Sequence, residues 1–167
     1  MRIARLAFIV ALFFSSFIFS GCAAIGERAN SEGNPKRAPK YDRPGYEAFI
    51  ENERLWVLVP GTAAWSNFIK LGEPTISATW IGEGPEGMTL RGADEDSLLG
   101  YVGQTAGFKA IPQKGVLYVF RDPSEALDKF EDFNRLEPRI EAKEAGPHAA
   151  TLVSNDQATI DAYLAAR

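Results

Sequence analysis

The chain has 167 residues, with 18 basic and 22 acidic side chains, and its formal net charge is −4. An acidic protein is not attracted to a polyanion, so this composition argues against nucleic acid as a partner. The single cysteine excludes a disulfide within the chain and a thiolate metal site. No pattern for a cofactor or a metal occurs in the sequence, and we expect neither.

The amino-terminal residues form three zones. Residues 1–5 carry Arg2 and Arg5 and no acid, residues 6–19 are an apolar run interrupted by two serines, and small residues then precede Cys22. This order is typical of a secretory signal. The apolar run is shorter than the roughly 20 residues that a membrane-spanning helix needs. We therefore expect residues 1–21 to be a signal peptide.

The residues Phe19-Ser20-Gly21-Cys22 resemble the lipobox of bacterial lipoproteins, with Phe in place of the usual Leu. The resemblance covers the signal alone, and it implies cleavage before Cys22 and attachment of palmitate-type acyl chains to Cys22. Two or three chains give stable membrane attachment, whereas one chain is marginal. It implies a membrane-anchored cell-envelope protein, on the periplasmic face of the outer membrane if the cell is Gram-negative, because Ala23 follows the cysteine. The alternatives are an uncleaved signal anchor and an ordinary signal with a coincidental cysteine.

Residues 22–42 are rich in small, polar and charged side chains. Such a segment buries too little apolar surface to offset the entropy of ordering it, so we expect a flexible tether after the lipidated cysteine.

The remainder of the chain is internally duplicated. Two halves, 43–104 and 105–167, align after a shift of 62 residues. The matched residues are Gly45-Tyr46 with Gly107-Phe108, Leu55-Trp56-Val57-Leu58 with Leu117-Tyr118-Val119-Phe120, Phe68 with Phe130, Gly84-Pro85 with Gly146-Pro147, Asp94 with Asp156, and Tyr101 with Tyr163. A local shift by two further places aligns Glu73-Pro74 with Glu137-Pro138. Turn residues as well as apolar residues match, so we expect two repeats within one compact domain.

Each half follows the pattern ββαββα. In the first half we expect strands at 46–50, 54–59, 75–81 and 88–91, with a helix at 62–72 and a second helix through residue 101. In the second half, Asp122-Pro123-Ser124-Glu125 predicts a helix with Asp122 as its cap and Pro123 at its first position. The predicted fold class is α+β: two tandem ββαββα repeats with pseudo-twofold symmetry and helices packed on antiparallel or mixed sheets.

The second strand of each half is apolar on both faces, so we expect it to be central and covered on both sides. Two interpretations remain open for one face. Its residues either form a core where the units meet, or form an open platform for an apolar ligand or a partner protein. The residues of this candidate site are Trp56, Leu58, Trp80, Tyr118 and Phe120.

Other candidates for chemistry have simpler explanations. His148 is expected to be an exposed turn residue, and Asp94-Glu95-Asp96 to cap a helix. No nucleophile, phosphate-loop or zinc pattern is found, while a carboxylate pair such as Glu47 with Glu73 stays open. The leading hypothesis is a non-catalytic, lipid-anchored interaction or scaffold module that binds an envelope protein. The alternatives are a binding protein for a small apolar ligand and, more weakly, a carboxylate-dependent hydrolase of envelope polymers.

Overall fold

A computed structural model describes residues 35–167. The predicted signal peptide, the lipobox with Cys22, and most of the predicted tether lie outside these residues.

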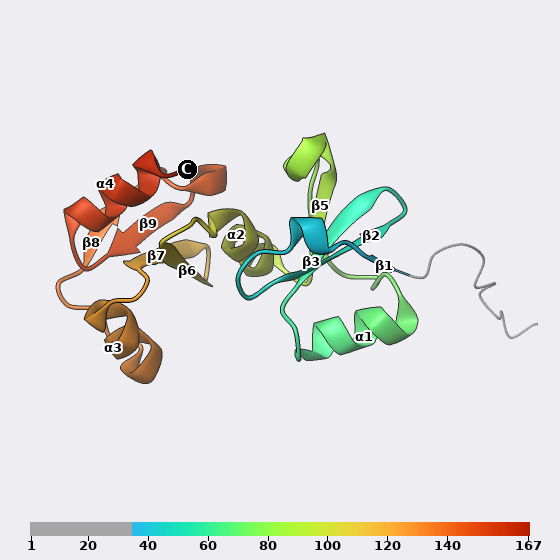
Figure 1. Ribbon diagram of the computed structural model, residues 1–167, viewed down its shortest axis with the longest axis horizontal. Coiled ribbons are helices and arrows are strands. Elements are labelled where there is room, and N and C mark those ends of the chain that lie inside the picture. Colours follow the sequence, from blue (N-terminus) through green and yellow to red (C-terminus); the bar gives the residue numbers. More distant parts are fainter. Residues whose placement is uncertain (1–34) are drawn as a thin grey trace, which may run out of the picture. The chain divides into compact units, whose positions relative to one another are not determined.

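The described part has the predicted α+β class, with the ββαββα pattern in both halves (Figure 1). The first repeat contains β2 (Glu47–Glu51), β3 (Arg54–Leu58), α1 (Ala63–Leu71), β4 (Ala78–Trp80), the short 3-10 helix η2 (Pro85–Gly87), β5 (Thr89–Gly92) and α2 (Glu95–Gly103). The second contains β6 (Phe108–Gln113), β7 (Val116–Arg121), α3 (Glu125–Phe133), β8 (Ile140–Ala142), η3 (Pro147–Ala149), β9 (Thr151–Ser154) and α4 (Gln157–Ala165).

The 62-residue spacing holds in the strand register. Leu55 pairs with Leu90 between the parallel strands β3 and β5, and Leu117 pairs with Leu152 between β7 and β9. The spacing continues through β4 and β8, because Ala78 is opposite Gly92 and Ile140 is opposite Ser154. The strands therefore keep a single spacing, and the additional two-place shift expected near residue 74 does not extend into β8.

The two sheets are mixed and similar. Their strand orders are β1-β2-β3-β5-β4 and β6-β7-β9-β8, so the apolar strands β3 and β7 are internal, as predicted. A two-residue turn of positive φ, Asn52-Glu53 or Lys114-Gly115, closes the first hairpin of each repeat. Such turns match the twist of the strands that they join.

A shared core connects the repeats. It contains Leu55 and Val57 of β3, Leu117 and Val119 of β7, and residues of α2. Helix α2 packs against its own sheet and also against β6 and β7 of the second repeat (Figure 1). A Cβ atom on Gly103 of α2 would lie 2.7 Å from the Leu117 side chain, so glycine permits this close approach.

The contacts between the repeats are head to tail. Helix α4 packs mainly against β7 and β9 of its own repeat, whereas α2 also packs against β6 and β7 of the second repeat. The Tyr101 hydroxyl donates to the Tyr41 carbonyl at 2.7 Å, and the Tyr163 hydroxyl donates to the Gly103 carbonyl at 2.8 Å. Tyr163 and Gly103 each lie 62 positions after the residues of the first pair, Tyr101 and Tyr41. The second repeat therefore uses the end of α2 as the first repeat uses Tyr41.

The folded part begins earlier than predicted. Residues 36–42, assigned to the tether, form β1 (Lys36–Arg37) and the short 3-10 helix η1 (Pro39–Tyr41). Arg37 donates to both carboxyl oxygens of Asp42 at 2.6 and 2.7 Å and to the Ala48 carbonyl at 2.9 Å. The composition of this segment is polar, but Ala38 and Tyr41 are buried.

The start of α3 also differs from the prediction. Ser124, not Asp122, is the capping residue, and its hydroxyl accepts the Leu127 N–H. Thr62 caps α1 in the same way, 62 residues earlier. Asp122 and Pro123 precede the cap, so the helix begins two residues later than the sequence predicts.

Candidate functional site

The predicted aromatic site is divided between the two repeats. Trp56 and Leu58 are 0% and 2% exposed, and they form a core beneath α1 with Phe49 and Phe68. Helix α1 covers this face because its apolar side packs on β3. These residues are buried in a core within the first repeat, whereas the core interpretation expected them where the two units meet.

The equivalent residues of the second repeat lie beneath α3. Phe120 is fully buried and packs with Leu127 and Phe130, while Tyr118 is partly buried beside them. The Tyr118 hydroxyl accepts a hydrogen bond from Arg139 at 2.8 Å. The structure therefore places two separate cores where the sequence suggested one aromatic surface.

Trp80, the fifth predicted residue, lies where the repeats meet. Its ring stacks on His148 with the centroids 4.1 Å apart, and its indole N–H donates to Glu95 at 2.6 Å. His148 is half exposed and is 4.0 Å from the Glu83 carboxylate. The turn position predicted for His148 is confirmed, but its side chain joins the two repeats.

The acidic run Asp94-Glu95-Asp96 has three separate roles. Asp94 caps α2 by accepting the Ser97 N–H at 2.7 Å, as predicted. Glu95 accepts from Trp80, and Asp96 accepts the backbone N–H groups of Lys114 and Gly115 in the second repeat. Within residues 35–167, no group of His, Cys, Asp and Glu is arranged to hold a metal ion.

A cluster of charged side chains lies at the carboxyl end of α1. Glu73 accepts from Arg54 at 2.9 and 3.2 Å, and also from Arg91. The Arg91 guanidinium is 4.7 Å from the centre of the Trp56 ring and also donates to Ser77. Glu73 is thus an anion held between two guanidinium groups.

Glu51 is the second acid of this cluster and is 7% exposed. Burial raises the pKa of its carboxyl above the ordinary value, and the nearby Glu73 carboxylate adds to this effect. Its Oε2 atom, Trp56 Nε1 and Arg91 Nε have no hydrogen-bond partner among the described residues. The acid next to Glu73 is therefore Glu51 and not the predicted Glu47, whose carboxylate accepts from Trp65 at 2.7 Å.

The charged cluster belongs to the first repeat alone. The positions equivalent to Glu51, Arg54 and Arg91 are held by Gln113, Val116 and Val153. Arginine still covers the strand aromatic in the second repeat, with Arg139 lying 5.3 Å from the centre of the Tyr118 ring. Guanidinium stacking is therefore general to the fold, while the buried acid is particular to one half. The alignment of the repeats could have identified this cluster, because its charged residues in the first repeat face uncharged residues at the equivalent positions of the second.

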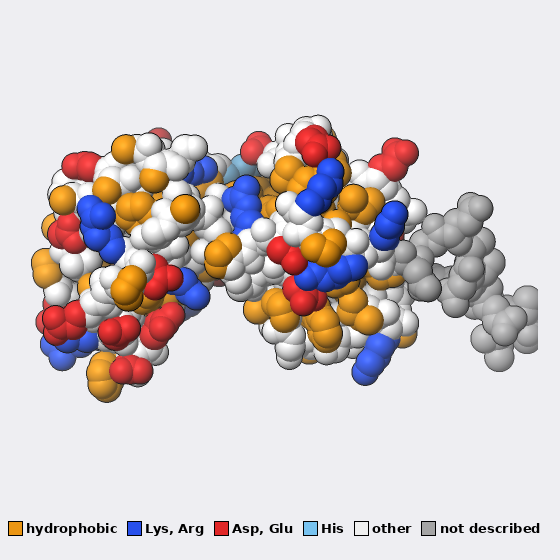
Figure 2. All heavy atoms as spheres, viewed as in Figure 1, with side chains coloured by type: hydrophobic (Ala, Val, Ile, Leu, Met, Phe, Trp, Pro, Cys, Tyr) orange, Lys and Arg blue, Asp and Glu red, His pale blue; other side chains and the backbone are white. Residues whose placement is uncertain are grey.

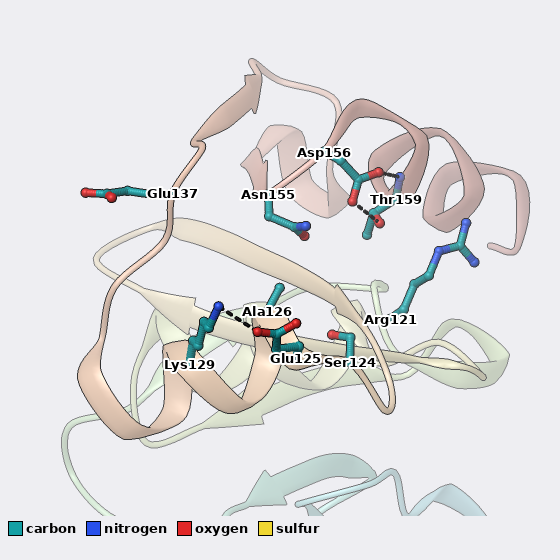
Figure 3. Close-up of a pocket in the computed structure, with 9 residues that line it drawn as sticks. All are labelled: Arg121, Ser124, Glu125, Ala126, Lys129, Glu137, Asn155, Asp156 and Thr159. Atoms are coloured by element: carbon teal, nitrogen blue, oxygen red, sulfur yellow. Dashed lines mark hydrogen bonds and ion pairs between the residues drawn. The ribbon is translucent and has the colours of Figure 1, made fainter.

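A pocket of about 350 Å³ lies at the carboxyl ends of β7 and β9, where α3 and α4 begin (Figure 3). In sheets with parallel strands this end commonly holds ligands, and helix amino termini attract anions. The lining residues are Arg121, Ser124, Glu125, Ala126, Lys129, Glu137, Asn155, Asp156 and Thr159.

The polar groups of this pocket mostly serve one another. Asp156 accepts both the N–H and the hydroxyl of Thr159 (Figure 3). Ser124 caps α3. Lys129 pairs with Glu125 at 2.7 Å. Carboxyl groups also outnumber cations in the lining. The pocket therefore lacks the excess of donors that an anion site needs.

Exposed apolar side chains lie at the end of α1 and in the stretch that follows it. The end of α3 shares the first of these, because Phe133, the equivalent of Leu71, is 73% exposed. Leu71, Ile76 and Ile81 are 80%, 86% and 84% exposed. Residues 74–82, which we call the β4 segment, contain no charged side chain. The equivalent residues 136–144 contain Glu137, Arg139, Glu141, Lys143 and Glu144.

The neighbouring helices show the same contrast. Acidic side chains gather over α3, whereas few charged side chains lie over α1 (Figure 2). The sequence pattern at 75–81 predicts a strand but does not indicate which of its side chains are exposed, so the β4 segment is found only in the structure.

Comparison with protein families, curated proteins and solved structures finds no match for this chain. Within residues 35–167, none of the helices has the length and apolar character needed to span a bilayer.

Proposed function

We propose that this chain is a lipid-anchored protein of a bacterial cell envelope whose folded part binds another envelope protein and carries out no reaction itself. The observation that carries the proposal is the 80–86% exposure of Leu71, Ile76 and Ile81 along one short stretch of chain. Large apolar side chains that gather on a surface mark contact sites for other molecules. The lipobox resemblance at Cys22 supports attachment to a membrane.

Crosslinking in the cells of origin tests the binding. A photo-reactive amino acid at Leu71 is expected to form a defined product with one envelope protein. The same group at Glu131, exposed on α3, is the matched control and is expected to give no such product. Equal labelling from both positions, or none from Leu71, contradicts the proposal.

A cysteine variant tests the anchor. Cys22→Ser is expected to abolish incorporation of labelled palmitate and to release the protein from the membrane fraction. Membrane attachment that persists without the label would indicate an uncleaved signal instead.

A hydrolase is a second candidate because Glu51 and Glu73 are adjacent acids in unequal surroundings. Acid and base roles require such inequality, and a raised pKa in a cluster is typical of functional sites. Against this, Trp56 is fully buried and Glu51 nearly so, which leaves a substrate little access. Turnover of an envelope polymer by the purified protein, abolished by Glu51→Gln, would replace the binding proposal.

A further inference from the structure

We propose that β4 binds an extended segment of the partner protein as an additional strand at the edge of the first sheet. This inference rests on the proposed binding function and specifies how the partner is held. Strand addition uses the free backbone N–H and C=O groups of an edge, and the side chains beside it select the partner.

The sheet edges at β1 and β6 are protected. Strand β1 is only two residues long, and both residues, Lys36 and Arg37, are charged. Strand β1 covers β2, and the Ala38 N–H donates to the Ala48 carbonyl at 2.8 Å. In the second sheet the equivalent carbonyl, that of Ala110, accepts from the Gln104 side chain at 2.9 Å. Pro112 on β6 also lacks an N–H to donate, as is typical of protected edges.

The remaining two edges, β4 and β8, differ in charge. Along β8, Arg139 pairs with Glu141 at 2.7 Å, and Lys143 follows. Charged side chains on an edge oppose pairing with another strand. Strand β4 has exposed Thr79 where β8 has Glu141, and exposed Ile81 where β8 has Lys143. Of the four sheet edges in the described part, β4 is therefore the one without such protection.

The surroundings of β4 define the chemistry of the partner. Ile76 and Ile81 flank the strand and favour apolar or β-branched side chains opposite them. Near the amino end of β4, Arg54 and Arg91 neutralise Glu73. Just beyond the carboxyl end, the Glu83 side chain is 53% exposed. The matching segment is extended and uncharged along its middle, with a basic residue at the end next to Glu83.

The test gives β4 the residues of β8. The variant Thr79→Glu with Ile81→Lys changes two exposed side chains, so the fold is expected to remain, as checked by circular dichroism. A photo-reactive group at Ile76 of the full-length protein, in its own cells, is expected to crosslink the partner. The double substitution is expected to reduce this product about tenfold, equivalent to about 1.4 kcal/mol of binding. The reverse change in β8, Glu141→Thr with Lys143→Ile, is the matched control and is expected to leave the product unchanged.

Mass spectrometry of the product is expected to identify an extended, centrally uncharged segment, and amide exchange at residues 76–81 is expected to slow in the complex. An undiminished product in the double variant, or unchanged amide exchange, overturns strand addition while crosslinking from Leu71 still supports partner binding. A product made of two copies of this chain overturns the assignment to another protein. The absence of a product from Leu71 overturns the proposed function itself.

Discussion

Glu51 and Gln113 hold equivalent positions before the first hairpin turn of each repeat, and they differ in charge. Because burial and the Glu73 carboxylate raise the pKa of Glu51, the folded state holds its proton more tightly than the unfolded state. The stabilisation from this proton is complete below the ordinary value of 4.5 and is lost as the pH rises through the raised pKa.

We therefore expect Glu51→Gln, which copies the second repeat, to raise the melting temperature at pH 7 by a few degrees. Near pH 4 the gain is expected to vanish, because wild-type Glu51 is then protonated in both states. Thermal unfolding across this pH range measures the difference, with Glu131→Gln as an exposed control. A variant that is less stable at pH 7 would show that the Glu51 carboxylate is favourably paired.

The buried hydroxyls of Tyr101 and Tyr163 make equivalent hydrogen bonds to backbone carbonyls. Replacing either tyrosine by Phe leaves a buried carbonyl without its donor, and is expected to cost about 1–2 kcal/mol. Tyr118→Phe is the comparison. The Tyr118 hydroxyl accepts a hydrogen bond from Arg139 in an exposed position, so a smaller loss of stability is expected. Urea unfolding gives all three values, and a loss for Tyr118→Phe as large as the others would refute the assignment.

At the level of elements, the internal alignment was a better guide than local pattern. Asp122-Pro123 resembles a helix start, yet the cap is Ser124, which the 62-residue spacing from Thr62 identifies. Local capping signals tolerate a shift of a few residues, whereas a duplicated fold fixes the position. The prediction that β3 and β7 are internal strands is confirmed. A strand that is apolar on both faces does not reveal, however, which helix covers each face. That ambiguity is why Trp56 was a candidate for an open surface.

Helix α2 provides a prediction at this scale. A Cβ atom on Gly100 would overlap the Tyr46 hydroxyl and would lie 2.8 Å from Pro112. Gly100→Ala is therefore expected to destabilise the protein by about 1–3 kcal/mol through overpacking, although alanine favours helix by about 1 kcal/mol. In α4 the equivalent residue is Ala162, which is only partly buried. Ala162→Gly is expected to cost about 0.5–1 kcal/mol from helix propensity alone. Chemical denaturation measures both, and a stabilised Gly100→Ala protein would contradict this packing.

For the whole molecule, the shared core predicts a single unfolding transition. The three tryptophans, Trp56, Trp65 and Trp80, all lie in the first repeat, so their fluorescence reports that half, while far-ultraviolet circular dichroism reports both. Because α2 packs on both sheets, the two signals are expected to coincide in urea. Phe130→Ala, in the second repeat, is expected to cost about 3–5 kcal/mol and to shift both signals equally. A tryptophan signal that does not move would show independent repeats.

The sequence predicted the fold class and the duplication because apolar spacing and turn residues recur together in both halves. The head-to-tail relation was not accessible in this way. Repeated sequence establishes that two units are alike, but the direction of their contact depends on side-chain packing such as that of Gly103 against Leu117. The β4 segment was missed for a related reason, since exposure at a sheet edge follows from strand order.

The position of α2 between two sheets has a consequence for the substitutions that the two equivalent helices can accept. One copy has neighbours on two sides, and the other, α4, has its sheet on one side and solvent on much of the other. A substitution in α2 therefore changes the packing of both halves, while α4 can accept substitutions on its exposed side without loss of packing. Gly100 and Gly103 stand in α2 where α4 carries Ala162 and Ala165. Two helices at equivalent positions thus differ in how much variation each can accept.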